Sequence, residues 1–220
     1  MAKTFGAVLG KQSGRIGQIV GRVTRGKQYF AVLPTVAKDR KVSSKEQDVR
    51  LKFKTLTQLA KGFKQGIKVS LERYAKYAPY ITPYNHFVKL NKDAVHVVDG
   101  VAEIDYGNIL LAPEGGDIPG VGFGQADFTE PLTAKVDFAP NSDVPGTDAA
   151  DQVYLFVYEP SSGQGLLSAP AQRSTGVVEV TLPSTWSGVE VHVYGFTIGA
   201  GRDNLGLDSP STYIGTGIVG

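Results

Sequence analysis

The residue types that most often perform chemistry are sparse in this sequence. It contains no cysteine, which excludes disulfides, thiolate metal sites and thiol nucleophiles. Its histidines, His86, His96 and His192, have a spacing that fits no zinc-binding pattern. No Gly-x-Ser-x-Gly segment is present to hold a serine nucleophile on a sharp turn. These absences favour a protein that is not an enzyme and that uses neither a metal ion nor an organic cofactor.

Three segments come close to known ligand-binding motifs but depart from them. Residues 21–28 lack the Ser or Thr that follows the lysine of a P-loop, and a strand-like segment follows instead of a helix. The glycines of residues 120–124 precede no helix, so they form no dinucleotide-binding turn. The carboxylates of residues 137–151 do not follow the order of a calcium loop and indicate a solvated loop. A small-ligand binder is therefore, like an enzyme, a disfavoured class.

Charge is the functional signal that remains. Residues 1–100 hold 20 of the 23 Lys and Arg against six acids, a net charge of +14. Residues 101–220 hold three bases against 15 acids, a net charge of −12. Such asymmetry indicates an anionic partner for the basic half. Attraction between the two halves, within one molecule or between neighbours, is the alternative.

The basic residues expected to meet that partner fall into two groups. One group lies in a glycine-rich segment near the N-terminus, and the other on one flank of a predicted helix, which turns by roughly 100° per residue. The candidate residues are Arg15, Arg22, Arg25, Lys27, Arg50, Lys54, Lys61, Lys64 and Lys68. A lysine-rich helix face that is simply solvated would explain the second group as well.

The first group is placed by a predicted β-ribbon. Residues 15–24 and 28–33 are predicted to form two strands joined by a turn at Arg25-Gly26-Lys27. Alternation along the first strand would put Ile16 and Val20 on the same face. Glycines within the ribbon would allow another backbone to approach closely.

A long amphipathic helix is predicted to place the second group. Ser43 and Ser44 are N-cap candidates, each followed three residues later by Glu or Gln. Apolar residues then recur every three or four positions, which is typical of a helix with one buried stripe. The stripe consists of Val49, Phe53, Leu56, Ala60, Phe63, Ile67, Leu71 and Tyr74. Gly62 and Gly66 weaken the prediction that this helix is unbroken.

Aromatic residues and a hairpin follow the helix. Residues 74–87 contain several tyrosines, which could stack on nucleic-acid bases or pack beneath the helix. Residues 95–98 and 101–106 flank Asp99-Gly100, a pair that suits a type I′ hairpin turn.

The remainder of the chain has the pattern of an all-β domain. Short strands without helix signals are predicted at residues 134–138, 152–158, 165–168, 177–182, 189–198 and 212–218. This spacing favours an immunoglobulin or fibronectin type III-like sandwich. The predicted fold class is therefore α+β. Residues 1–112 form a basic ribbon, helix and hairpin region, residues 113–124 a Gly/Pro linker, and residues 125–220 the sandwich.

Motifs at both ends of the chain resemble those of a known group of proteins. The N-terminal motif is Ser13-Gly-Arg-Ile-Gly-Gln-Ile-Val-Gly21, followed by Arg25-Gly26 and Pro34. The C-terminal motifs include Trp186-Ser-Gly188 and Val191-His-Val-Tyr194. On these residues the sequence resembles a Bacteroidota family of uncharacterised proteins of about this length. The resemblance implies the same two-part layout and no activity.

Two hypotheses follow for the function. The first is a structural or assembly protein, such as a virion or surface-lattice component, which forms homo-oligomers or binds other protein subunits. The second is a nucleic-acid-binding protein whose N-terminal half neutralises the phosphates of DNA or RNA. Neither a signal peptide nor an apolar run of about 18 residues is present. We therefore expect a cytoplasmic protein, or a particle assembled from a cytoplasmic pool.

Overall fold

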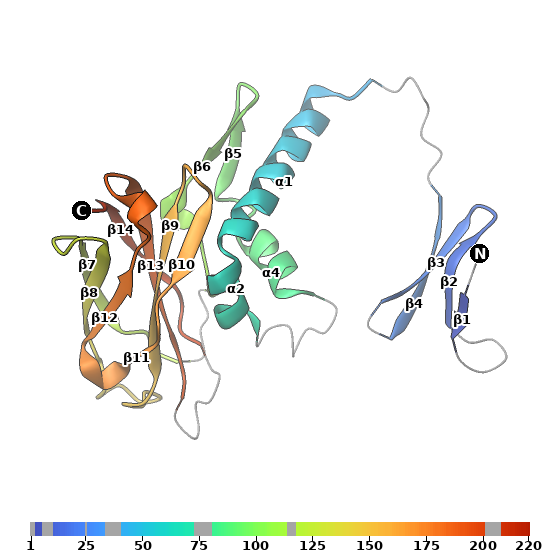
Figure 1. Ribbon diagram of the computed structural model, residues 1–220. Helices are drawn as coiled ribbons and strands as arrows, with labels where there is room; N and C mark the ends of the chain where they lie inside the picture. The colour runs from blue at the N-terminus through green and yellow to red at the C-terminus, as the bar shows by residue number, and fades with distance from the viewer. Residues whose placement is uncertain are drawn as a thin grey trace. The chain divides into compact units, whose positions relative to one another are not determined.

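The computed structural model describes residues 3–5, 11–24, 26–33, 41–72, 81–113, 118–200 and 208–220. The fold is α+β, with antiparallel sheets and a largely β C-terminal region (Figure 1). The chain divides into two compact units, Met1–Ser44 and Lys45–Gly220. Each is described by itself below.

The N-terminal unit is a small antiparallel sheet. Its strands pair in the order β1-β2-β3-β4. Their bounds are Lys3–Phe5 for β1, Lys11–Ile16 for β2, Ile19–Thr24 for β3 and Lys27–Val32 for β4. Of the turn expected at Arg25-Gly26-Lys27, the position of Gly26 is confirmed by its φ of 79°, but Lys27 already belongs to β4 and pairs with Thr24. Arg25 lies outside the described residues.

The predicted single strand over residues 15–24 is wrong, because a turn divides it. Gly17 and Gln18 form a two-residue loop, and Ile16 pairs with Ile19 across it. Gly17 has a φ of 59°, a left-handed conformation that glycine adopts without steric cost at the first position of a hairpin loop. The turn changes the faces of the sheet, so that Ile16 shares a face with Ile19 and not with Val20.

The second unit begins with helices. They are α1 (Ser44–Gly62), α2 (Lys64–Ser70) and α4 (Pro83–Leu90). Thr82 caps α4 by accepting a hydrogen bond from the backbone N–H of Asn85, and Pro83 occupies the first helical position, where its missing N–H costs nothing. Residues 73–80, which carry several of the tyrosines discussed above, lie outside the described residues.

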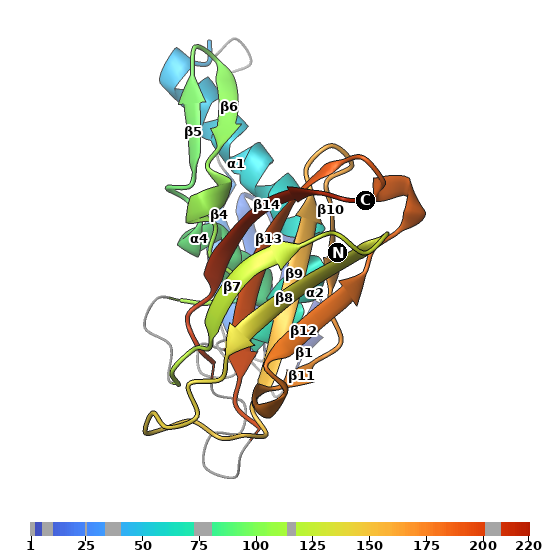
Figure 2. The same ribbon diagram turned by 90° about the vertical axis from the view of Figure 1, so that its left-hand side faces the viewer.

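The hairpin predicted around Asp99-Gly100 is confirmed. It consists of β5 (Val95–Val98) and β6 (Val101–Ile104), and both turn residues have positive φ, as a type I′ turn requires. The second strand is shorter than predicted, because a 3₁₀ turn, η1 (Tyr106–Asn108), follows it. Figures 1 and 2 show the hairpin extending beside α1.

Two antiparallel sheets make up the C-terminal region. One has the order β12-β8-β7, and the other has the order β10-β9-β13-β14 with β11 pairing to β9. The first comprises β7 (Gly122–Asp127), β8 (Thr133–Ala139) and β12 (Val177–Thr181). The second comprises β9 (Gln152–Glu159), β10 (Gln164–Leu167), β11 (Ala171–Gln172), β13 (Glu190–Ile198) and β14 (Thr212–Ile218). Figure 2 shows the β12-β8-β7 sheet in front of β9 and β13. Short 3₁₀ turns, η2 (Arg173–Thr175) and η3 (Ser184–Trp186), lie in the connections.

The central sheet is buried on both faces. One face of β9 and β13 packs against β8 and β12 through valine and leucine side chains, with Trp186 in the same core. The other face carries Phe156, Tyr158, Tyr194 and Phe196, which form a second core with the helices. Helix side chains in that second core include Leu59, Phe63, Ile67, Leu71 and Phe87. The helices therefore cover one side of the sheet, as Figure 1 shows.

This packing gives a division of the chain that differs from the one expected from the sequence. The helices of the predicted basic region share a core with β9 and β13, so they lie in one compact unit with the sheets. Strand β7 begins at Gly122, inside the segment expected to be a linker over residues 113–124. The physical reason is that aromatic side chains on the outer face of the sheet need an apolar cover.

Candidate functional site

One face of the N-terminal sheet is apolar. The pairing register places Ile16 beside Ile19, Ile19 beside Val32, and Gly21 beside Phe30. These side chains are exposed, with 55% of Ile16, 47% of Ile19, 59% of Phe30 and 67% of Val32 accessible. We call Ile16, Ile19, Phe30 and Val32 the apolar face; the described strands place no charged side chain among them.

The opposite face of the same sheet is basic. The register puts Arg15 beside Val20, Arg22 beside Tyr29 and Thr24 beside Lys27. Arg15, Arg22 and Lys27 are all exposed, so the structure brings three of the candidate residues to one surface, the basic face. Arg15 also donates from Nε to the carbonyl oxygen of Gly17 at 2.8 Å, which fixes the hairpin loop. A hollow of about 270 Å³ on this face is lined by Val20, Arg22, Tyr29 and Ala31 among others.

Among the described residues of its own unit, no second layer covers this sheet. Among the described residues of the unit whose exposure is known, only Gly21 is buried. A sheet of this size normally needs a packed layer over its apolar side. Burial of apolar surface must compensate for the conformational entropy that the chain loses when the strands become ordered. The apolar face is thus a candidate contact surface.

The helix candidates lie in the other unit. Arg50, Lys54, Lys61, Lys64 and Lys68 are all exposed. Arg50 is paired with Glu46 through an ion pair of 2.8 Å between Nη2 and Oε1, four residues apart on α1. Lys61, Lys64 and Lys68 line one apolar hollow of about 350 Å³ between α1, α2 and α4. The structure therefore groups the three C-terminal lysines of the predicted flank.

The apolar stripe of α1 is buried only in its second half. Leu56 is buried, and burial continues along the stripe through Leu71. Val49 and Phe53, which the sequence placed in the same stripe, are 66% and 58% exposed. The prediction was wrong for these two residues because α1 starts before the sheet that covers the rest of the stripe.

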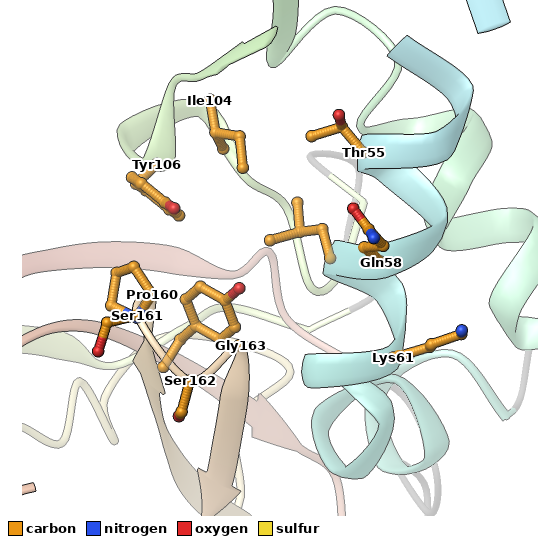
Figure 3. A pocket seen from close by; sticks show the side chains of 11 residues that line it. Thr55, Gln58, Lys61, Ile104, Tyr106, Pro160, Ser161, Ser162 and Gly163 are labelled. Carbon is orange, nitrogen blue, oxygen red and sulfur yellow. The ribbon is translucent and has the colours of Figure 1, made fainter. Parts of the chain in front are cut away.

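Sequence reasoning missed a pocket at the junction of α1, η1 and the turn between β9 and β10. Its volume is about 500 Å³ (Figure 3). Polar groups in its lining come from Thr55, Gln58, Tyr106, Tyr158, Ser161 and Ser162. Figure 3 shows Thr55 and Gln58 on the helix facing Ile104 and Tyr106 across the opening. No sequence motif marks this pocket, because its residues come from three distant segments.

A buried carboxylate holds the turn that forms one wall. Glu159 accepts hydrogen bonds from the backbone N–H groups of Ser161 and Ser162 and from the Ser161 hydroxyl. Burial alone would raise the pKa of Glu159, but the hydrogen bonds from Ser161 and Ser162 outweigh it and lower the pKa. Glu159 is therefore ionised at neutral pH, and its carboxylate is occupied by the hydrogen bonds of the turn.

The two tyrosines of the pocket are held in place by neighbours. Tyr106 stacks on His192 with ring centroids 4.0 Å apart, and Nδ1 of His192 lies 2.9 Å from Oη of Tyr213. Tyr158 packs against Phe63 at 4.6 Å. Burial, and then the neighbouring Tyr106 and Glu159, raise the pKa of Tyr158 to about 12, and burial also raises the pKa of Tyr106. Both phenols are thus neutral hydrogen-bonding groups.

Comparison with known proteins places the chain in a family. The model of a family of unknown function, DUF6266, matches residues 10–215. The chain belongs to the DUF6266 family. No curated protein matches the sequence of this DUF6266 member. Membership therefore confirms the resemblance to an uncharacterised family and assigns no activity.

Metal-binding groups and membrane-spanning helices are both absent from the described part of the DUF6266 chain. Within it, no group of three or more His, Asp or Glu side chains is arranged to hold a metal ion. Over the same residues, no helix combines the length and apolarity that crossing a bilayer requires. The candidate site of this DUF6266 member is thus a pair of surfaces and a pocket.

Proposed function

We propose that this chain is a non-enzymatic structural or assembly protein that uses its basic N-terminal part to contact other protein subunits. The observation that carries the proposal is the uncovered apolar face formed by Ile16, Ile19, Phe30 and Val32. Contiguous exposed apolar surface of this kind marks an interaction site in soluble proteins. A subunit docked on it would supply the second layer that the sheet lacks.

Charge makes a second copy of the chain the favoured partner. The N-terminal unit, Met1–Ser44, carries nine basic residues against Asp39, a net charge of +8. The unit Lys45–Gly220 carries 14 basic and 20 acidic residues, a net charge of −6. Opposite charges on the two units steer copies together, so association of the N-terminal unit of one copy with the second unit of another is favoured. The product is a homo-oligomer.

The strand order supports an immunoglobulin-like or fibronectin type III-like sandwich as the accompanying module. Lettered in chain order, β7, β8 and β12 take the places of strands A, B and E in one sheet. Strands β9, β13 and β14 take the places of C, F and G in the other. Such modules serve as outward-facing parts in many assemblies, which is an analogy of fold. A virion or a surface lattice is the setting that this proposal favours.

Oligomeric state tests the proposal directly. Light scattering on the full chain at increasing concentration should show association. The double variant Ile19→Thr/Phe30→Ser should reduce it strongly, because both changes remove apolar contact from the apolar face. The matched variant Val20→Thr/Ala31→Ser alters neighbours on the opposite face and should retain association. A full chain that stays monomeric at every concentration, or equal loss in both variants, would overturn the proposal.

Nucleic-acid binding is a second candidate, favoured by one observation on the opposite face. Arg15, Arg22 and Lys27 share that face with Tyr29, which is 50% exposed. Basic groups around an accessible aromatic ring on a sheet are suited to bind phosphates and stack on a base. The variant Arg15→Gln/Arg22→Gln/Lys27→Gln should then weaken binding of single-stranded DNA and reduce the slope of log affinity against log salt by about 0.7 per lost phosphate contact. Absence of binding at low salt would remove this candidate.

A further inference from the structure

We propose that the pocket between α1, η1 and the β9–β10 turn binds a neutral, hydroxyl-rich ligand, a single sugar ring at the end of a glycan. The inference does not depend on how copies of the chain assemble. It rests on hydroxyl groups that face the pocket without a protein partner, on the apolar side chains beside them, and on the fixed walls.

The walls are fixed by close packing between α1 and the turn. A Cβ placed on Gly62 would lie 2.5 Å from the carbonyl oxygen of Gly163, so only glycine lets α1 come this near. The turn is held by Glu159, and β10 is tied to α2 by a hydrogen bond of 3.0 Å from the backbone N–H of Leu167 to Oε1 of Gln65. A pocket with preset walls loses little entropy when a ligand enters.

Two phenol hydroxyls are available to a ligand. Tyr158 is 95% buried, with 5% of its surface accessible, and its side chain lines the pocket. Neither Oη of Tyr158 nor Oη of Tyr106 has a hydrogen-bond partner among the described residues, and the same holds for the side-chain amide of Gln58. Neither phenol oxygen is among the buried unpaired side-chain atoms of the described residues, so both reach solvent in the pocket and can exchange water for a ligand hydroxyl.

The chemistry of these groups selects the ligand. A phenol hydroxyl and a carboxamide each both donate and accept hydrogen bonds, as a sugar hydroxyl does. Both phenols are neutral at physiological pH, and the carboxylate of Glu159 is already hydrogen-bonded within its own turn. These groups therefore favour a neutral ligand over a charged one. Leu59, Ile104 and Pro160 supply apolar contact, which suits the C–H face of a sugar ring. Lys61 belongs to the lining at the end of α1, but Figure 3 shows its side chain directed away from Tyr106.

Size and openness agree with a terminal sugar. A volume of about 500 Å³ falls in the usual range of small-ligand pockets, roughly 300–1,000 Å³, and exceeds that of one hexose ring. The pocket is partly open to solvent, which leaves room for the rest of a glycan to extend outwards.

The test is a binding measurement on the full chain. Glucose, galactose, mannose and N-acetylglucosamine are titrated separately and followed by saturation-transfer NMR. We expect at least one of them to bind saturably, and the variants Tyr158→Phe and Tyr106→Phe each to weaken it about two- to tenfold, as loss of one hydrogen bond predicts. Tyr154→Phe is the matched control, because that hydroxyl donates to Gln152 and does not line the pocket.

Each other outcome counts against the proposal. If none of the sugars binds at the highest soluble concentration, the proposal is wrong. Binding that Tyr158→Phe and Tyr154→Phe affect equally would place the ligand elsewhere. Binding of glucose 6-phosphate alone, abolished by Lys61→Gln, would show that the pocket selects an anion and not a neutral sugar.

Discussion

Arg173 is a fully buried charge in the β-rich C-terminal region. Its Nε donates to Oδ2 of Asp151 at 3.2 Å, and its other nitrogens donate to the carbonyl oxygens of Pro140 at 2.7 Å and Pro119 at 2.6 Å. Asp151 in turn accepts from the backbone N–H of Asp148 at 3.0 Å. One guanidinium thus joins the segments that contain Pro119, Pro140 and Asp151.

Replacing Arg173 by Met should lower the free energy of unfolding by about 3–5 kcal/mol, because Asp151 would keep a buried charge without its partner. Arg50→Met is the matched control, since Arg50 forms an exposed ion pair with Glu46, and its loss should cost about 0–1 kcal/mol. Urea unfolding of both variants measures the difference. Equal losses would show that the buried pair contributes no more than the exposed one.

Tyr158 should make the protein sensitive to alkali. Its pKa rises from an ordinary 10 to about 12, mainly through burial, so the folded state keeps the proton more tightly than the unfolded chain does. Stability is therefore unaffected below pH 10 and falls as pH rises towards 12, by about 2–3 kcal/mol from this residue. Unfolding measured across that range should show a smaller fall in Tyr158→Phe. A variant with the same pH dependence as the original chain would contradict this assignment.

At the residue scale, the sequence identified the exposed basic residues but not how they are arranged. Arg15 and Arg22 lie on one face only because a turn at Gly17-Gln18 separates their strands; alternation along the single strand predicted for residues 15–24 would have put them on opposite faces. Arg173 and Asp151 had no periodic pattern around them, and their partners come from loops that meet only in the folded chain. The tyrosines of the pocket were hidden for the same reason.

At the scale of elements, the glycines of α1 and α2 govern how the helical layer meets the sheet. A Cβ on Gly66 would lie 2.9 Å from Leu111 and 3.1 Å from Phe156, and one on Gly62 would meet the backbone of Gly163. From the sequence these glycines indicated a weak helix. In the fold they permit close packing, and the helix does end at Gly62 before α2 begins at Lys64.

Gly62→Ala should therefore destabilise the chain by about 1–3 kcal/mol, because the backbone oxygen of Gly163 cannot move aside and the gain in helix propensity is smaller. Gly120→Ala is the control, since its Cβ would meet only Ser209 at an ordinary 3.6 Å. Thermal unfolding of the two variants tests the prediction. A Gly62→Ala chain as stable as the Gly120→Ala chain would refute the close approach.

The elements were foreseeable from the sequence to different degrees. The helix start at Ser44, the Asp99-Gly100 hairpin and the strand at residues 212–218 match the structure, because caps, turn residues and alternation are local signals. The Gly17-Gln18 turn was missed, since this pair is a weaker hairpin signal than Asn-Gly. The nearly continuous apolar run of β9 is typical of a strand that is buried on both faces. A search for alternating apolar and polar residues does not detect such burial.

At the scale of the whole molecule, the two units differ in both charge and apolar burial. The unit with net charge +8 has one uncovered apolar face, while the unit with net charge −6 contains two apolar cores. If copies associate as proposed, both steering by charge and burial of the apolar face contribute. The two contributions respond differently to salt.

Raising salt should therefore weaken association without abolishing it. Screening lengths fall from about 10 Å at 0.1 M salt to about 3 Å at 1 M, which removes long-range attraction between the units. Burial of Ile19 and Phe30 is not screened and should maintain a residual oligomer. Sedimentation of the full chain at low and high salt measures this. Complete dissociation at high salt would mean that charge alone holds the copies together.

The two-sided burial of β9 and β13 has a consequence for synthesis of the chain. The helices carrying Phe63 and Phe87 leave the ribosome well before Phe156 and Phe196 exist to receive them. Until then the apolar side chains of the nascent helices are exposed, and the chain can aggregate because the sheet that covers those side chains has not formed. Translation speed and chaperone supply should thus influence the yield of folded protein.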